Sequence, residues 1–516
     1  MAPTLFYYLS FLTAIALVNA GLPSKIYGVN LGSWLVMESW ILPDEWVRMG
    51  GDNCQNCSGT CIGSEFALAQ KYPETVDQIF NQHWETWFNQ PDVDQIKGAG
   101  LNTVRVPLGY WIVEPLVNRT TEFYPRGGIL QLQRGLTHLR DAGISVILDH
   151  HALPGVASPN QMFAGRCTSD VQFYTPYNYH RALIWTAVMT ALSHLDPAFG
   201  SVAAIEAINE PILDANKTPG YGDFQKNFVQ VIRAVELTLG IPPVSGEVPP
   251  ILASQVNVTS ALSAAATLQN NFNPEVCRVL KDAVPIFAQV AQQLVLNTSL
   301  ELGGLSSILQ QRTALVTNFM DIGWQYNNPS NPADAAIGPQ IYDNHLYYSY
   351  GGVADANEQA YLTSICNLKT IQTHAALGSS PLLIGEWSLG TQFNANASDV
   401  FMKQWADAQK LAYGKDAGWI FWNFKLENST LTADLPRQWS YMEGLRRGYF
   451  TQDPSKFNDP YVCDAYINVT MTTTTATSGL TLLSDRRPQR LALILWLIGI
   501  GLWGSFPLYH YVSNPN

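Results

Sequence analysis

The chain has 516 residues, which is enough for one large α/β domain or two domains of medium size. Only 14% of the residues are charged and the formal net charge is −12, so the surface would repel phosphate and binding of nucleic acid is excluded. The 15 Trp and 23 Tyr residues offer flat faces that suit sugar rings, although aromatic side chains more often fill a core.

The first 20 residues, MAPTLFYYLSFLTAIALVNA, form an apolar stretch that ends in small residues around a cleavage position. This pattern is typical of a secretory signal peptide. The rest of the chain agrees with export, because it carries N-x-Ser/Thr acceptor sites for glycosylation. They lie at Asn56, Asn118, Asn216, Asn257, Asn297, Asn396, Asn428 and Asn468.

Seven cysteines follow, at positions 54, 57, 61, 167, 277, 366 and 463. The close trio Cys54, Cys57 and Cys61 has no fourth Cys or His at the spacing of a zinc site. Disulfides are therefore favoured over a metal in an oxidising compartment. The odd number leaves at least one thiol unpaired or intermolecular, and the pairing cannot be deduced from the sequence.

Short β-branched runs alternate with helical patterns through the middle of the chain. Helical patterns include 180–195 and 398–413, and the predicted strands are 25–32, 102–109, 144–151, 202–211, 313–320, 340–347, 381–388 and 417–424. Eight strands alternating with helices predict an α/β fold, a (β/α)8 TIM barrel within a domain at 21–470. The alternative is an open doubly wound sheet, but no Gly-rich dinucleotide turn follows the first strand.

Three segments depart from the regular alternation. Residues 212–312, between the fourth and fifth strands, are far longer than a usual barrel connection and predict a large insertion, either a lid or a decoration. Residues 471–490 form a Thr-rich polar stalk. Residues 491–516 are mostly apolar and uncharged, which indicates a membrane tether: either a spanning segment or a cleaved signal for a lipid (GPI) anchor.

Polar and aromatic residues recur where the predicted strands end. They are Arg105, His151, Asn209, Glu210, His345, Tyr347, Glu386 and Trp422. Active sites of barrels are built at the carboxyl ends of the strands, so we expect these residues to converge.

Glu210 and Glu386 form the pair of carboxylates that hydrolysis of a glycosidic bond requires. We expect Glu210 to protonate the leaving oxygen, and Glu386 to attack the sugar while Arg105, His345 and Tyr347 keep it ionised. If the sugar configuration is retained, the two carboxyl groups should lie about 5–5.5 Å apart. Alternation along 202–211 puts Glu206 on the side of Glu210 but deeper, as a buried structural acid that needs a partner inside the barrel.

Seven stretches together resemble glycoside hydrolase family 5, most closely its fungal exo-β-1,3-glucanases. They are GVNLGSWLVMESW, TVRVPLGYW, LDHHALPG, AINEP, DNHLYY, IGEWSLG and GWIFWNFK, in that order between residues 25 and 463. The resemblance implies a retaining glycosidase that releases glucose from the non-reducing ends of β-1,3-glucan in the cell wall. The alternatives are a β-1,6-glucanase, a broad β-glucosidase or transglycosylase of the same fold, or a non-catalytic glucan-binding wall protein.

The same resemblance assigns roles to residues. Glu210 becomes the general acid/base and Glu386 the nucleophile. The substrate-binding residues implied are Glu38, Arg105, His151, Asn209, His345, Tyr347, Trp422, Phe163 and Tyr350. The last two correspond to a pair of phenylalanines that clamp the next glucose, although here the second is Tyr. No metal and no cofactor are implied, and we expect a monomer at the cell surface or in the wall that acts on β-glucan.

Overall fold

A computed structural model describes residues 21–54, 57, 61–241, 255, 257–269, 271–296, 312–324, 337–393 and 397–467. The predicted signal peptide, stalk and C-terminal tether lie outside these residues. Within the described ranges, no helix combines the length and the apolar character that crossing a membrane requires.

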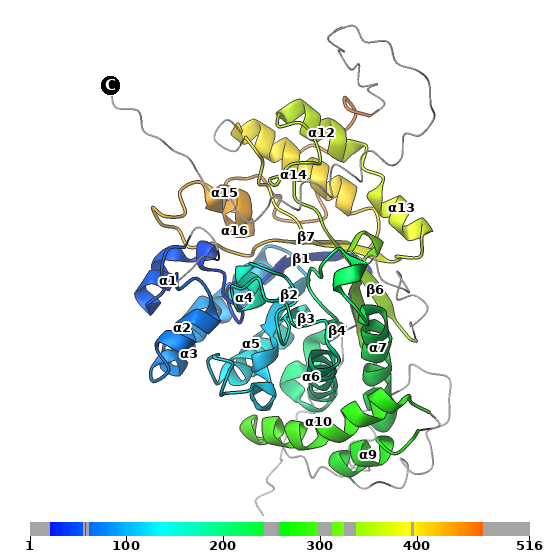
Figure 1. Ribbon diagram of the computed structural model, residues 1–516. Coiled ribbons are helices and arrows are strands. Elements are labelled where there is room, and N and C mark those ends of the chain that lie inside the picture. The colour runs from blue at the N-terminus through cyan, green and yellow to red at the C-terminus, as the bar shows by residue number, and fades with distance from the viewer. Residues whose placement is uncertain are drawn as a thin grey trace, which may run out of the picture.

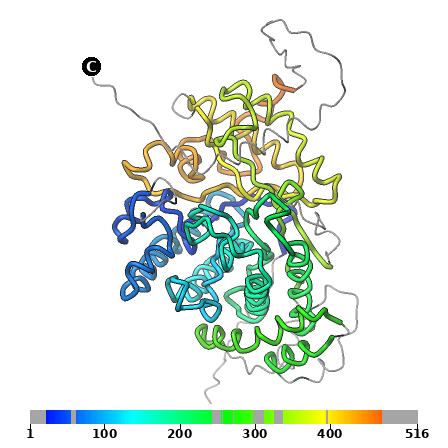
Figure 2. The backbone as a smooth tube through the Cα atoms, in the orientation of Figure 1, coloured from blue at the N-terminus to red at the C-terminus, as the bar shows by residue number. Residues whose placement is uncertain are grey.

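Eight parallel strands close into a barrel in sequence order, which confirms the predicted (β/α)8 fold (Figure 1). The first strand pairs with the last, Val29 opposite Phe421, so the chain returns to its starting point around the barrel (Figure 2). The strands are β1 Ile26–Asn30, β2 Thr103–Gly109, β3 Ser145–Ala152, β4 Val202–Glu206, β5 Val316–Met320, β6 Gln340–His345, β7 Leu382–Glu386 and β8 Gly418–Phe421.

Helices surround this barrel. They are α1 Pro43–Met49, α2 Glu65–Lys71, α3 Val76–Trp87, α4 Gln90–Gly98, α5 Gly128–Ala142, α6 Pro176–Leu195, α7 Tyr221–Thr238, α9 Val258–Ala265, α10 Pro274–Gln293, α12 Glu358–Cys366, α13 Thr370–Ala376, α14 Asp399–Tyr413, α15 Leu435–Trp439 and α16 Tyr441–Arg446. The helices predicted at 180–195 and 398–413 correspond to α6 and α14. Both begin with a side-chain cap: Thr175 accepts from the amide of Asn178, and Ser398 accepts from that of Phe401.

Alternation along the strands divides the barrel into an apolar floor and a polar layer. The floor is a separate cluster of buried residues made by Ile26, Ile147, Ala204, Ile341, Leu383 and Ile420. Two residues further along their strands, Asp149, Glu206 and Asp343 point into the same interior and are fully buried. The interior therefore changes from apolar to strongly polar toward the carboxyl ends of the strands.

The chain between β4 and β5 begins as a regular barrel connection and then departs from it. Helix α7 packs against α6 as barrel helices do, so the additional chain starts after α7 rather than at residue 212. Helices α9 and α10 lie against the outer helices α6 and α7 (Figure 1). Val276, Val279, Leu280 and Phe287 of α10 are buried at helical spacing in the main hydrophobic core. The described part of the insertion is thus an extension of the core.

Six of the seven cysteines form disulfides, which confirms the preference for disulfides over zinc. The pairs are Cys54–Cys61, Cys57–Cys167 and Cys366–Cys463, and Cys277 keeps a free, buried thiol. Of the four acceptor asparagines that the structure describes, Asn118, Asn216 and Asn428 are exposed.

Candidate active site

Glu210 and Glu386 stand at the carboxyl ends of β4 and β7, but Glu210 is not on a strand. Strand β4 ends at Glu206, five residues earlier than expected, and the alternation assumed up to residue 210 does not hold. Glu210 has a positive φ of 41°, a conformation that few residues other than glycine adopt. The hydroxyl of Ser158 donates to its carbonyl oxygen and holds this turn. The loop after β4 therefore sets the direction of the Glu210 side chain. Strained backbone of this kind is often found at functional sites.

The two carboxylates approach closely on either side of one histidine. One oxygen of Glu210, one oxygen of Glu386 and a ring nitrogen of His345 all lie within 4.8 Å of one another. His345 Nδ1 is 2.7 Å from Glu210 Oε1 and 3.5 Å from Glu386 Oε2. This spacing falls near the separation of about 5–5.5 Å that retaining glycosidases use and below the inverting range of about 6.5–9.5 Å.

Arg105, on β2, reaches these groups from inside the barrel and is fully buried. Its five N–H donors face five acceptors: both oxygens of Glu206 at 2.8 and 3.1 Å, Asn30 Oδ1 at 3.1 Å, Glu386 Oε1 at 2.9 Å and Asn209 Oδ1 at 2.8 Å. The predicted partner of Glu206 is thus Arg105. The contact also orients the Asn209 amide, whose N–H groups remain as donors.

Arg105 is shared among more carboxylates than it can neutralise. Its guanidinium lies 3.0 Å from Asp149 and 3.7 Å from Asp343 as well as beside Glu206. Burial raises the pKa of Glu206 to about 8 and that of Asp149 to about 7, although Arg105 opposes both shifts. At neutral pH the buried acids of the barrel interior are therefore partly protonated rather than all ionised.

Glu386 is almost completely buried, and its oxygens are both used. Arg105 binds Oε1 and the hydroxyl of Tyr347 donates to Oε2 at 2.8 Å. Burial raises the pKa of Glu386, while His345 and Arg105 pull it down. These contacts fix the carboxylate in one orientation, as a nucleophile requires.

The two histidines of the site differ in charge. Burial lowers the pKa of His151 to about 3, so its ring is neutral, and its Nδ1 contacts Asp149 Oδ2 at 2.6 Å. Burial also disfavours the charged form of His345, but the charge of Glu386, the hydrogen bond to Glu210 and the nearby Asp343 carboxylate outweigh it. The pKa of His345 therefore lies well above its usual value.

Glu38 belongs to the same site. Trp40 Nε1 donates to its Oε2 at 2.9 Å, and the hydroxyl of Ser33 binds the backbone N–H and carbonyl of Glu38. The preceding amide, of Met37, donates to buried Glu65 at 2.7 Å. Burial raises the pKa of Glu38 to about 8; the Trp40 bond opposes this shift, and the charges of Glu386 and Glu210 add to it.

Aromatic rings surround these acids. Trp422 lies nearly parallel to the ring of His151, 5.8 Å away, and Phe163 contacts the same ring edge-on at 5.4 Å. The ring of Tyr350 lies 5.7 Å from that of Tyr347 and is 43% exposed. All three predicted aromatic residues are therefore beside residues of the site.

Two further tryptophans were not predicted. Trp439, from α15, packs against Tyr347 at 5.3 Å and against Trp40 at 5.4 Å. Trp324, after β5, meets the ring of His345 at 5.9 Å. Neither stands in a motif, so only their place after a barrel strand could have indicated them.

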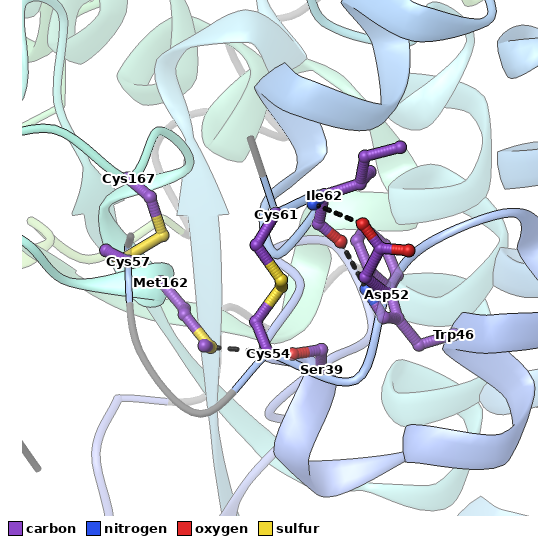
Figure 3. Close-up of a disulfide and its surroundings, with 9 residues drawn as sticks. All are labelled: Ser39, Trp46, Asp52, Cys54, Cys57, Cys61, Ile62, Met162 and Cys167. Carbon is purple, nitrogen blue, oxygen red and sulfur yellow. Dashed lines mark hydrogen bonds between the residues drawn. A yellow bond between two sulfur atoms is a disulfide. The ribbon is translucent and has the colours of Figure 1, made fainter. Parts of the chain in front are cut away.

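One disulfide joins the loop after β1 to the loop after β3 (Figure 3). Cys57–Cys167 links the two loops, and the hydroxyl of Ser39 donates to the sulfur of Met162, next to Phe163. Because Ser39 follows Glu38, these contacts connect the segment that carries Glu38 to the loop that carries Phe163.

Several other residues have structural roles. His150 stacks on Trp185 with ring centroids 4.0 Å apart, as expected of a structural histidine. Trp387 is fully buried against Phe421, so this side chain belongs to the core. Trp34 is also fully buried, against Phe88, and belongs to the core.

Two groups in the described residues have the spacing of metal ligands: Glu206, Asp343 and His345, and Glu210, His345 and Glu386. In both groups the guanidinium of Arg105 lies within 4 Å of a carboxylate member. A fixed positive charge beside the ligand oxygens disfavours a second cation.

Comparisons with known proteins agree with this geometry. The profile of the family described as cellulase (glycosyl hydrolase family 5) matches residues 69–428. Glucan endo-1,6-beta-glucosidase B of Emericella nidulans is 28% identical over 85% of this chain and 88% of its own length. Glucan 1,3-beta-glucosidase of Blumeria graminis is 32% identical over 36% of this chain and 41% of its own. The crystal structure of rutinosidase from Aspergillus niger superposes with a TM-score of 0.53 and 18% identity, over 83% of this chain and 98% of that one, which shows a shared fold.

Proposed function

Because the chain belongs to glycosyl hydrolase family 5 and is a glucan hydrolase, we propose that it is a retaining β-glucanase. In this proposal Glu386 is the nucleophile and Glu210 the general acid/base. The observation that carries it is the approach of the two carboxylates, whose oxygens lie within 4.8 Å. At that distance no water fits between the sugar and the second carboxylate, so direct attack is the available chemistry.

The reaction would proceed in two steps. Glu386 attacks the anomeric carbon while Glu210 gives a proton to the departing oxygen, and a glycosyl–enzyme ester forms. Water then adds to the same carbon, Glu210 accepts its proton and Glu386 leaves. Arg105 and Tyr347 hold Glu386 in place, and the Asn209 amide, oriented by Arg105, would bind the sugar hydroxyl beside the anomeric carbon.

We propose β-1,6-linked glucan as the substrate. The similarity to relatives named endo-1,6-beta-glucosidase extends over 82–85% of the chain, whereas the similarity to those named 1,3-beta-glucosidase covers 36–41%. This ranking reverses the preference for β-1,3 linkages that the motifs indicated. The motifs lie around the reacting bond, so similarity along most of the chain is the stronger guide to the linkage.

An exo-β-1,3-glucanase is the second candidate. It is favoured by Glu38, which could bind the terminal hydroxyls of a chain end, and by Phe163 and Tyr350, which could hold the next glucose. The three disulfides support an oxidising, extracellular setting for either enzyme. We keep the expectation of a secreted or surface-bound monomer as part of the proposal.

Digestion of pustulan (β-1,6) and laminarin (β-1,3) tests these proposals, with the Glu386→Gln variant as the inactive control. A ladder of gentio-oligosaccharides from pustulan supports endo-1,6 cleavage; glucose released mainly from laminarin supports the second candidate. Proton NMR during the first minutes should show the β anomer first. Initial release of the α anomer would overturn the retaining mechanism.

A further inference from the structure

Asp343 is a buried acid beside His345 that the mechanism above does not use. It lies on β6, two residues before His345, and is fully buried. Its Oδ1 accepts from the amide of Gly385, the residue before Glu386, at 2.7 Å. A Cβ atom on Gly385 would lie 2.0 Å from Asp343 Oδ2, so only glycine admits this carboxylate against β7.

The other oxygen of Asp343 faces His345. Oδ2 lies 3.8 Å from His345 Nε2 and 3.7 Å from Arg105 Nε. Among the described residues, neither Asp343 Oδ2 nor His345 Nε2 has another hydrogen-bond partner. A small movement of either side chain makes them partners, and both atoms are buried away from water.

This arrangement decides which nitrogen of His345 carries a proton. A carboxylate only accepts hydrogen bonds, so the nitrogen that faces it is protonated. Nε2 is therefore the N–H that points to Asp343. Nδ1, on the other side of the ring, lies 2.7 Å from Glu210 Oε1.

We propose that Asp343 is a positioning residue that keeps Nε2 of His345 protonated, so that Nδ1 and Glu210 share a single proton. The proposal rests on the assignment of Glu210 as the general acid/base. In the first step the shared proton moves to Glu210 and from there to the leaving oxygen as the C1–O bond breaks. In the second step Glu210 takes a proton from the attacking water, which restores the shared proton.

Other charges around His345 act in the same direction. The groups that face it or Asp343 are Arg105 on β2, Asp149 on β3, Glu206 on β4, Glu210 after β4 and Glu386 on β7. The charge of Glu386 and the contacts with Asp343 and Glu210 favour a protonated imidazole, and burial opposes it. Asp343 differs from these other acids because, within the described residues, its carboxylate is the one that lies less than 4 Å from Nε2.

The Asp343→Asn variant tests the proposal because its amide cannot reproduce the carboxylate. The Asn oxygen would stay on the Gly385 amide, so its NH2 group would face His345 Nε2 and require a lone pair there. The proton would then be fixed on Nδ1 as a donor to Glu210, which would have to remain ionised. In this variant Glu386 should still act as the nucleophile, but Glu210 should no longer act as a general acid.

The expected readout is kcat/KM, which reports the first step, for two substrates. On glucan, whose leaving group needs a proton, we expect a loss of about 100-fold or more, within the range of general acid catalysis. On 2,4-dinitrophenyl β-gentiobioside, whose leaving group needs none, we expect a loss of less than about 3-fold. The apparent pKa of the high-pH limb of the kcat/KM profile on glucan should also fall by about one unit or more. The reason is that the proton shared by His345 and Glu210 is held less firmly in the variant.

Asp321→Asn is the matched control. Asp321 is equally buried at the end of the neighbouring strand β5, and its carboxylate contacts His374 and Asn344 instead. It should change kcat/KM for both substrates by the same factor and leave the pH profile in place. An equal loss on both substrates for Asp343→Asn would overturn the positioning role.

The Glu210→Gln variant separates this inference from the proposed function. If Glu210→Gln spares the dinitrophenyl substrate and Asp343→Asn does not, the positioning role is wrong and the acid/base assignment holds. If Glu210→Gln loses activity equally on both substrates, the acid/base assignment itself is wrong.

Discussion

Glu210 and Glu386 contact the same imidazole, with His345 Nδ1 2.7 Å from one carboxylate and 3.5 Å from the other. Two acids of the same kind are thereby placed in unlike surroundings. The side chain of Glu210 is 21% exposed and that of Glu386 only 7%. The more exposed acid can exchange protons with water, while the buried one is held by Arg105 and Tyr347.

This difference predicts distinct phenotypes for two alanine variants. Glu210→Ala should lower kcat on glucan by about 10²–10⁴-fold, the usual contribution of a general acid/base. Azide, which needs no base, should restore turnover of a dinitrophenyl glycoside and yield the β-glycosyl azide, detected by mass spectrometry and NMR. Glu386→Ala should yield the α azide or none. A β azide from Glu386→Ala would mean that the roles are exchanged.

Arg105→Lys should damage both stability and activity. A lysine has three donors on one atom and cannot reach five acceptors in a plane, so Glu206 and Glu386 would lose partners inside the barrel. Loss of one partner from a buried ion pair costs about 3–5 kcal/mol in the free energy of unfolding, measurable by urea denaturation. Arg446→Lys, at a side chain 68% exposed, is the control and should change it by less than about 0.5 kcal/mol. A stable Arg105→Lys enzyme would show that the network is dispensable for folding.

Stability should fall as the pH rises from about 5 to 8. Burial raises the pKa of Glu206 and Glu65 to about 8 and that of Asp149 to about 7 in the folded chain. Unfolded Glu and Asp titrate near pH 4, so between these values the folded state binds more protons than the unfolded state, and stability falls as the pH rises. The slope is about 1.4 kcal/mol per pH unit and group.

Unfolding midpoints measured by calorimetry across this range check the prediction. Glu65→Gln, which resembles the protonated acid, should make the dependence shallower, whereas Glu443→Gln on the surface should not. A midpoint that rises toward pH 8 would contradict the assignment of buried, protonated acids.

Removal of the Cys57–Cys167 disulfide should affect binding as well as stability. The bond closes a loop of sequence separation 110, so the double Ser variant should lose about 2–4 kcal/mol. Because this bond ties the Phe163 loop to the segment of Glu38, KM for glucan should rise more than kcat falls. The double variant at Cys54 and Cys61, of separation 7, is the control and should lose less stability. Equal KM values in the two double variants would show that the loop is positioned without the bond.

Much of this site could be predicted from the sequence because barrel geometry is regular. Strands rich in β-branched residues were placed to within a few residues, and polar residues at their ends had to converge. Alternation predicts the direction of side chains within a strand, but it does not predict the path of the chain beyond the end of the strand. Strand β4 ends at Glu206, and the direction of the Glu210 side chain depends on the left-handed backbone conformation of Glu210 itself rather than on strand alternation.

Other features had weaker signals. Trp439 reaches the site from a helix after β8, which no local pattern marks. Asp343 could have been found, since it lies two residues before His345 and therefore on the same face of the strand. Its contact with Gly385 could not have been predicted, because it joins β6 to the neighbouring strand β7 in the folded structure.

The apolar floor of the barrel closes the interior at the end opposite the site. Ile26, Ile147, Ala204, Ile341, Leu383 and Ile420 fill the end of the barrel opposite Glu210 and Glu386, so among the described residues the surroundings of the buried carboxylates are apolar on that side. Protons that they gain or lose must pass the same mouth through which the sugar enters. A bound sugar covers this mouth, so we expect the protonation pattern present at binding to be the one with which the first step proceeds.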